Sequence, residues 1–254
     1  MKLDGPFYQS FVEQGDRYTA DDRQCIERTV SRLSDIQTSE ERPGMLLGKI
    51  QSGKTKTFLA IMALAFDNNF DVTVVLTKGT QALAKQTYER ILSEFKRHDQ
   101  DDRLKVFDIM TMPNQLTGFE MNQKLVLVVK KQKDNLNRLI DLFSNKHPQL
   151  SKKRILVVDD EADYASVGFK KDQGEMDINT TALQLEKLRQ VAERTSFLQV
   201  TATPYALYLQ PDKIEIKGET FKPIRPAFTE LVPVNEAYIG SDYYFSEDHE
   251  EIEL

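Results

Sequence analysis

The sequence predicts an α/β fold with a mostly parallel central sheet, and three observations support this class. The chain has 254 residues, of which 40% are hydrophobic, so it can bury a sizeable core. Beyond Gly44, short apolar runs alternate with amphipathic stretches, which is typical of parallel strands joined by crossover helices. The runs are almost continuously apolar, as in strands that are buried on both faces. The predicted strands are 45–47, 72–76, 104–107, 125–129, 155–158 and 197–200.

A helix is predicted ahead of this sheet. Thr19 and Asp22 have the spacing of a capping box, in which each side chain accepts a hydrogen bond from the other residue's backbone. Apolar residues then recur at helical spacing, at Ile26, Val30, Leu33 and Ile36. Three further stripes predict helices that face the core: Ala84, Tyr88, Ile91, Leu92 and Phe95; Leu136, Leu139, Ile140 and Phe143; and, after a second capping box of Thr181 and Gln184, Leu185, Leu188 and Val191.

Two regions lack such periodicity. Residues 165–179 are polar and include two glycines, which predicts a long loop. After Pro204, four further prolines separate short runs such as 213–216, which predicts irregular strands or an exit segment.

Composition narrows the classes of site and location. The single cysteine, Cys25, has no partner for an internal disulfide, and the three histidines lack the spacing of a zinc site. The N-terminus lacks the apolar core of a signal peptide, and the longest apolar run, 59–66, is too short to span a bilayer, so a cytoplasmic location is expected. The net charge of −6 comes from six acids in residues 242–254, and the neutral remainder leaves a nucleic-acid partner open.

The sequence GKIQSGKT at 48–55 fits the Walker A pattern G-x-x-x-x-G-K-[ST]. An apolar strand precedes it and the apolar run 58–64 follows as a helix, which is the context that a phosphate loop requires. The glycines let successive N–H groups turn toward phosphates, and the helix N-terminus adds positive potential. We therefore predict that ATP contacts Gly48, Lys49, Ile50, Gln51, Ser52, Gly53, Lys54, Thr55 and Lys56.

Within this loop, Lys54 is expected to bridge the β- and γ-phosphates, and the Thr55 hydroxyl to bind Mg²⁺. A second signal is RILVVDDEAD at 154–163, where an apolar strand ends in carboxylates. Ligands bind at the carboxyl ends of parallel strands, so Asp160 is expected to hold Mg²⁺ and Glu161 to orient the attacking water. The predicted catalytic residues are thus Glu161, Lys54 and Asp160. The alternatives are a glycine-bearing turn and a solvated acidic turn.

The order of GKIQSGKT, DEAD at 160–163 and TATP at 201–204 resembles motifs I, II and III of superfamily 2 helicases. The loop and the segment PVNEAYIG at 233–240 also resemble Z1 domain-containing ATPases of bacterial restriction and phage-defence loci. The resemblance covers roughly residues 40–240. It implies a RecA-like P-loop NTPase lobe at 41–210, a helical extension at 1–40, and an irregular exit segment with an acidic tail at 211–254.

Two further motifs carry expected roles. Thr201 and Thr203 follow a strand end and are expected to hydrogen-bond the motif II carboxylates, above all Asp163, unless they only close a local turn. The segment 76–86 resembles motif Ia, which in that superfamily touches the nucleic-acid backbone. This resemblance implies contacts from Lys78, Gly79, Thr80 and Gln86. The lysines after the strand 125–129, at 130, 131 and 133, are candidates for phosphate contacts or a solvated surface.

Motors of this superfamily place ATP between two RecA-like lobes, the second of which supplies arginines. No second α/β series is visible after Pro204, so the chain is expected to be a first lobe that hydrolyses ATP weakly alone. The expected function is ATP binding and hydrolysis in a helicase or translocase that acts on nucleic acid, with DNA expected, in a restriction or phage-defence context. The alternatives are a nucleotide-gated binding module and a small-molecule kinase. Gln37 is the one candidate for reading the base.

Overall fold

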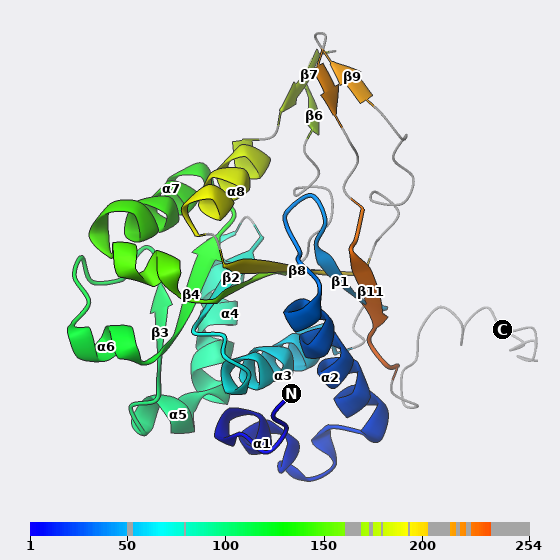
Figure 1. The fold of residues 1–254 in the computed structure, drawn as a ribbon, viewed down its shortest axis with the longest axis vertical. Coiled ribbons are helices and arrows are strands. Elements are labelled where there is room, and N and C mark those ends of the chain that lie inside the picture. Colours follow the sequence, from blue (N-terminus) through cyan, green and yellow to red (C-terminus); the bar gives the residue numbers. More distant parts are fainter. Residues whose placement is uncertain are drawn as a thin grey trace, which may run out of the picture.

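A seven-stranded, fully parallel sheet forms the centre of the computed structural model, which describes residues 1–49, 53–78, 80–160, 169–172, 175–178, 180–192, 194–202, 214–216, 219–221 and 225–234. The strand order is β11-β1-β8-β5-β2-β4-β3 (Figure 1). The strands are β1 (Gly44–Leu47), β2 (Val72–Thr77), β3 (Leu104–Asp108), β4 (Lys124–Lys130), β5 (Ile155–Asp160), β8 (Thr195–Thr201) and β11 (Phe228–Leu231). The α/β class and the six strands predicted from sequence are confirmed.

Helices cover both faces of the sheet (Figure 1). One face packs against α1 (Pro6–Val12), α2 (Ala20–Asp35), α3 (Lys54–Asp67), α4 (Gln81–Glu94) and the short α5 (Lys96–Gln100). The opposite face packs against α7 (Lys133–Asp141), its continuation η2 (Leu142–Lys146) and α8 (Thr180–Val191), with α6 (Gly118–Asn122) beside them. The short turns η1 (Gly15–Arg17) and η3 (Pro148–Lys152) complete the helical segments.

Strand β5 shows how alternation assigns side chains to the two faces. Leu156 and Val158 belong to the core on the α3 face, whereas Ile155 and Val157 belong to the core on the α7 face. Because successive side chains of a strand point to opposite faces, the next two residues of β5 also face opposite layers.

The N-terminal helices are part of the same core as the sheet. Thr19 and Asp22 form the predicted capping box at the start of α2. Phe11 of α1 and Ile26 and Val30 of α2 are fully buried in one cluster with α3. Helix α3 is buried from Phe58 to Phe66, because it lies between the sheet and these two helices. Among the described residues, none of the helices has the length and apolarity needed to cross a bilayer.

The second predicted capping box is wrong. Gln184 lies within α8, and its side-chain amide donates to the Lys133 carbonyl at 2.8 Å and to Asn137 Oδ1 at 2.7 Å. It thereby joins α8 to α7, whose apolar stripes are buried as predicted. A glutamine has the same spacing from a threonine in either role, so the sequence does not separate them.

Part of the predicted loop at 165–179 is also a hairpin. The backbone forms β6 (Phe169–Asp172) and β7 (Glu175–Ile178), which pair antiparallel, and a second hairpin follows with β9 (Ile214–Ile216) and β10 (Glu219–Phe221). Strand β6 reads FKKD, with one apolar residue in four, so it carries no alternating apolar signal.

Strand β11 is the largest difference from the prediction. Its residues fall in the predicted exit segment, yet they pair in parallel with β1 along its whole length. The strand is short and lies at the sheet edge, with Phe228 buried and Leu231 exposed, so its pattern is weak among the surrounding prolines. Glu230 is buried there and forms an ion pair with Arg32 of α2 at 3.1 Å.

Candidate nucleotide-binding site

The loop predicted to hold phosphates leaves the sheet beside the last residue of β8. Strand β1 ends at Leu47, which pairs with Thr201, and the Gly48 N–H donates to the Thr201 carbonyl at 3.1 Å. The loop therefore starts at the carboxyl edge of the sheet, next to the predicted motif III. Ile50, Gln51 and Ser52 lie outside the described residues.

Gly53 closes the loop in a conformation that glycine favours. Its φ is 85°, in the left-handed region, where any other L-residue is strained. The next residue begins α3, and the first helical hydrogen bond runs from the Thr57 N–H to the Gly53 carbonyl at 3.1 Å. The first N–H groups of an α-helix have no partner within the helix, so the N-terminus of α3 favours an anion.

Lys54 folds back over the start of its own loop. Its ammonium donates to the carbonyl of Lys49 at 2.7 Å and to that of Gly48 at 3.2 Å. The positive charge is therefore held at the mouth of the loop, beside the helix N-terminus. Thr55 is half-buried in the first turn of α3.

Lys56 points away from the loop and joins α3 to the N-terminal helices. Its ammonium donates to Asp22 Oδ2 at 2.8 Å and to the Arg17 carbonyl at 2.9 Å, and lies 4.9 Å from the centre of the Tyr18 ring. The same Asp22 caps α2. Only the backbone of Lys56 is then placed to contact a phosphate. The sequence gives no signal for this ion pair, because its partners are 34 residues apart.

Asp160 lies at the same edge of the sheet as the phosphate loop. It is the last residue of β5 and pairs with Val200 of β8, while the next residue of β8 pairs with Leu47 of β1. Gly48 and Asp160 are therefore two strands apart, which corresponds to about 10 Å. By strand alternation, Asp160 shares the face of Val158, which is the α3 side.

Asp159 faces the other layer and forms a buried ion pair with Lys131. The distance from Lys131 Nζ to Asp159 Oδ1 is 2.7 Å, and the two side chains are 3% and 6% exposed. Lys131 also donates to the Asp160 carbonyl at 3.3 Å. Its burial excludes the solvated surface group that was one of the two alternatives left open by the sequence.

The predicted coupling between motifs II and III falls only partly on described residues. Thr201 is 2% exposed, and its carbonyl accepts the hydrogen bond from Gly48. Glu161, Asp163 and Thr203 lie outside the described residues, so the hydroxyl-to-carboxylate contacts stay a prediction.

The predicted nucleic-acid residues lie at the carboxyl end of β2. Lys78 is exposed directly after the strand, Thr80 caps α4 by accepting from the Leu83 N–H at 3.3 Å, and Gln86 is exposed on α4. Gly79 lies outside the described residues. The described residues follow β2, which ends at the same sheet edge as β1 but lies on the far side of β5.

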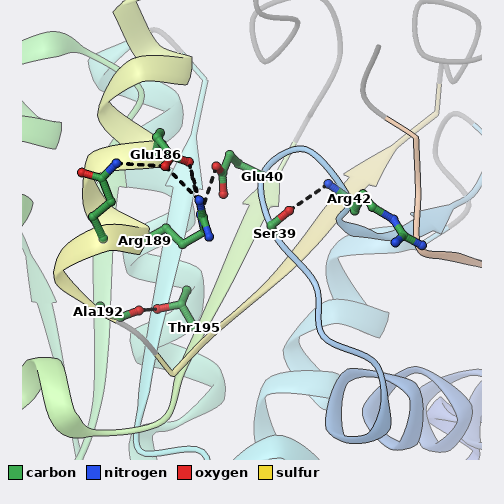
Figure 2. A network of polar contacts seen from close by, with 8 residues as sticks. Ser39, Glu40, Arg42, Glu186, Arg189, Ala192 and Thr195 are labelled. Atoms are coloured by element: carbon green, nitrogen blue, oxygen red, sulfur yellow. Dashed lines mark hydrogen bonds and ion pairs between the residues drawn. The ribbon is translucent and has the colours of Figure 1, made fainter. Parts of the chain in front are cut away.

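A network at the opposite edge of the sheet ties the segment before β1 to α8 (Figure 2). Arg189 contacts Glu40 at 3.3 Å and Glu186 at 2.8 Å. Burial, together with a hydrogen bond that protonated Glu40 donates to Glu186, raises the pKa of Glu40 to about 7. Gln37, the candidate for reading the base, is exposed three residues before Glu40.

Comparison with known proteins identifies the family. The profile of the DEAD/DEAH box helicase family matches residues 28–208, more than half of the chain. The chain belongs to the DEAD/DEAH box helicase family. No curated protein sequence matches it.

Solved structures agree with a helicase-like RecA lobe. The crystal structure of DUF1998 helicase MrfA bound to DNA and AMPPNP is 14% identical and covers 91% of this chain, with a TM-score of 0.55. The structure of MrfA bound to DNA is 13% identical and covers 88% of this chain, with a TM-score of 0.53. At these identities the likeness concerns the fold. The chain spans 29% of the MrfA chain in both structures.

Proposed function

We propose that this helicase-family lobe binds Mg·ATP at the carboxyl edge of its sheet and hydrolyses it to drive a motor on DNA. The observation that carries the proposal is that the loop joining β1 to Lys54 of α3 starts at the same sheet edge at which β5 ends in Asp160, with β8 between the two strands. Lys54 would contact the β- and γ-phosphates, after exchanging its loop carbonyls for phosphate oxygens.

The available ligands suit magnesium. No cluster of three or more His, Cys, Asp or Glu side chains with metal-binding geometry occurs among the described residues. Mg²⁺ held on a nucleotide needs only one or two protein ligands, and a hydroxyl and a carboxylate are the hard oxygen donors that it prefers. Thr55 and Asp160 would supply them, and the ion would neutralise charge that develops on the phosphates. Glu161 would orient and deprotonate the attacking water.

The proposed DNA surface follows from the same edge of the sheet. The segment Lys78, Gly79, Thr80 and Gln86 would contact the backbone, and a second RecA-like lobe, in the same or another chain, would supply the arginines. Support comes from MrfA, whose structure with DNA contains a similarly folded lobe. A restriction or phage-defence context of the Z1 type also belongs to this proposal and rests on the motif resemblance alone.

The test is ATP hydrolysis by the chain with and without single-stranded and duplex DNA. We expect slow Mg²⁺-dependent turnover that Lys54→Ala and Glu161→Gln abolish, with DNA raising the rate when the second lobe is present. Lys124→Ala is the matched control, because Lys124 lies at the amino end of β4, on the opposite edge of the sheet. If Mg·ATP binding depends on Lys54 but no phosphate is released with or without DNA or the second lobe, the chain is a nucleotide-gated switch and not part of a motor. Turnover unchanged in Lys54→Ala would contradict the proposed site.

A further inference from the structure

Two adjacent aspartates end β5, and the sheet must direct them to different places. Asp160 faces the α3 layer, where the phosphate loop lies, and Asp159 faces the α7 layer. A shift of β5 by one residue would exchange them, because the side-chain period of a strand is two. The apolar residues 155–158 resist such a shift weakly, since Ile, Leu, Val and Val suit either face.

Lys131 distinguishes the two carboxylates. It follows the end of β4, and its ammonium reaches past the end of β2, the strand between β4 and β5, to Asp159 Oδ1 at 2.7 Å. The same ammonium donates to the carbonyl of Asp160 at 3.3 Å. Its own backbone N–H donates to the Thr77 carbonyl at 2.9 Å. Three neighbouring strand ends are therefore tied together at one residue.

The burial of this pair points to positioning rather than to stability. Both side chains are almost fully buried, and two charges taken out of water are often no more stabilising than apolar residues of the same volume. A buried pair does fix one arrangement, because any register that separates the two charges loses their mutual attraction while both stay out of water. The arrangement fixed here is the one in which Asp160 faces the α3 layer.

We infer that Lys131 is a positioning residue for magnesium, which holds Asp160 toward the nucleotide by binding its neighbour Asp159 and its carbonyl. The inference rests on the proposed function, because it assigns a role toward the proposed metal site. In this arrangement Lys131 itself contacts neither metal nor phosphate. It acts on the affinity for Mg²⁺ through the end of β5.

The test measures binding of a fluorescent, non-hydrolysable ATP analogue to the full chain, with Mg²⁺ titrated from zero in the presence of a chelator. In Lys131→Met we expect the Mg²⁺ concentration for half-maximal enhancement to rise about tenfold, the scale of effects from groups that support a metal ligand. Affinity for the metal-free nucleotide should stay within about twofold, because Lys54 and α3 are untouched. Lys131→Arg should restore most of the Mg²⁺ response, since it keeps the charge.

Lys124→Met is the control, since it removes a Lys–Asp ion pair from the other end of the same strand. A Mg²⁺ response in Lys131→Met equal to that of Lys124→Met would overturn the inference while leaving the proposed function in place. If Lys131→Met does not fold, Asp159→Asn and Lys131→Arg decide by the same titration, and a wild-type Mg²⁺ response in the former overturns it. Wild-type chain that binds no nucleotide, or binds it equally in Lys54→Ala, would instead refute the proposed function.

Discussion

The two ends of strand β4 carry the same pair of residue types in different surroundings. At the amino end, Lys124 contacts Asp71 at 2.9 Å, with side chains that are 23% and 36% exposed. At the carboxyl end, Lys131 contacts Asp159 at 2.7 Å, with both side chains buried. Water can solvate the charges of the first pair if the contact breaks, whereas breaking the second pair would separate two buried charges at a large cost in free energy. Of these two ion pairs, the buried one therefore lies at the sheet edge where the phosphate loop begins.

The largest effect that separates the two edges is expected from Lys54→Ala. Loss of this ammonium removes the charge held at the loop mouth, so turnover should fall about 100-fold or more, as for loss of one preorganised donor. Steady-state phosphate release measures it, and Lys124→Ala should keep the wild-type rate. Equal rates for the two variants would mean that the edges do not differ in function.

Loss of the buried ion pair should also lower the free energy of unfolding more than loss of the half-exposed pair. Lys131→Met removes the ammonium that Asp159 contacts in a buried ion pair and is expected to lower the free energy of unfolding by about 3–5 kcal/mol. Lys124→Met affects a half-exposed pair and should cost about 1 kcal/mol or less. Urea denaturation of both variants gives the comparison. Similar losses would show that the burial of the carboxyl-edge pair has no energetic consequence.

Gly53→Ala tests the turn between the phosphate loop and α3. The left-handed φ of 85° should make this change cost about 1–2 kcal/mol. The cost comes from backbone strain and not from a steric clash, because a Cβ there would lie no closer than 4.0 Å to its nearest neighbour. Nucleotide affinity should fall together with thermal stability. Gly118→Ala, in the first turn of α6, is the control, and an equal effect there would argue against a special conformation at Gly53.

The amino edge should show pH dependence without a functional effect. Burial raises the pKa of Glu40 from 4.5 to about 7, so its contribution to stability is fully present below about pH 4.5 and is lost as the pH rises through 7. Glu186, whose pKa is lowered to about 2 by its hydrogen bonds to Glu40 and Arg189, changes stability only at lower pH.

Glu40→Gln removes the ionisation and should remove this pH dependence. Between about pH 5 and 8, the wild type should lose about 2 kcal/mol more than the variant in urea denaturation. Affinity for Mg·nucleotide should be unchanged in the variant at either pH. A loss of nucleotide affinity in Glu40→Gln would show that the amino edge influences the nucleotide site, which would contradict the functional difference between the two edges.

The part of the fold that repeats one local pattern is predictable from sequence. Six strands show continuous apolar runs, and the Thr19 capping box depends on residues three apart. Strand β11 is not predictable in this way, because four residues with one buried aromatic side chain carry little pattern. Its place beside β1 depends on pairing with residues more than 180 positions earlier.

The candidate site divides along the same line. GKIQSGKT and the carboxylates after β5 are local patterns, and their shared edge follows from the parallel sheet. The ion pairs around them are not local. Lys131 and Asp159 are 28 positions apart, and Lys56 and Asp22 are 34 apart, so each lysine looks like a surface residue in the sequence. The adjacent aspartates at the end of β5 do carry a local signal, because only one of them can face the nucleotide.

The most direct test of the central claim is a crystal structure of the chain with Mg²⁺ and AMPPNP. We predict one magnesium ion on the triphosphate, with Lys54 against the β- and γ-phosphates, Asp160 facing the metal and Asp159 still paired with Lys131. A nucleotide bound away from the end of β5, or a metal faced by Asp159 in place of Asp160, would contradict it.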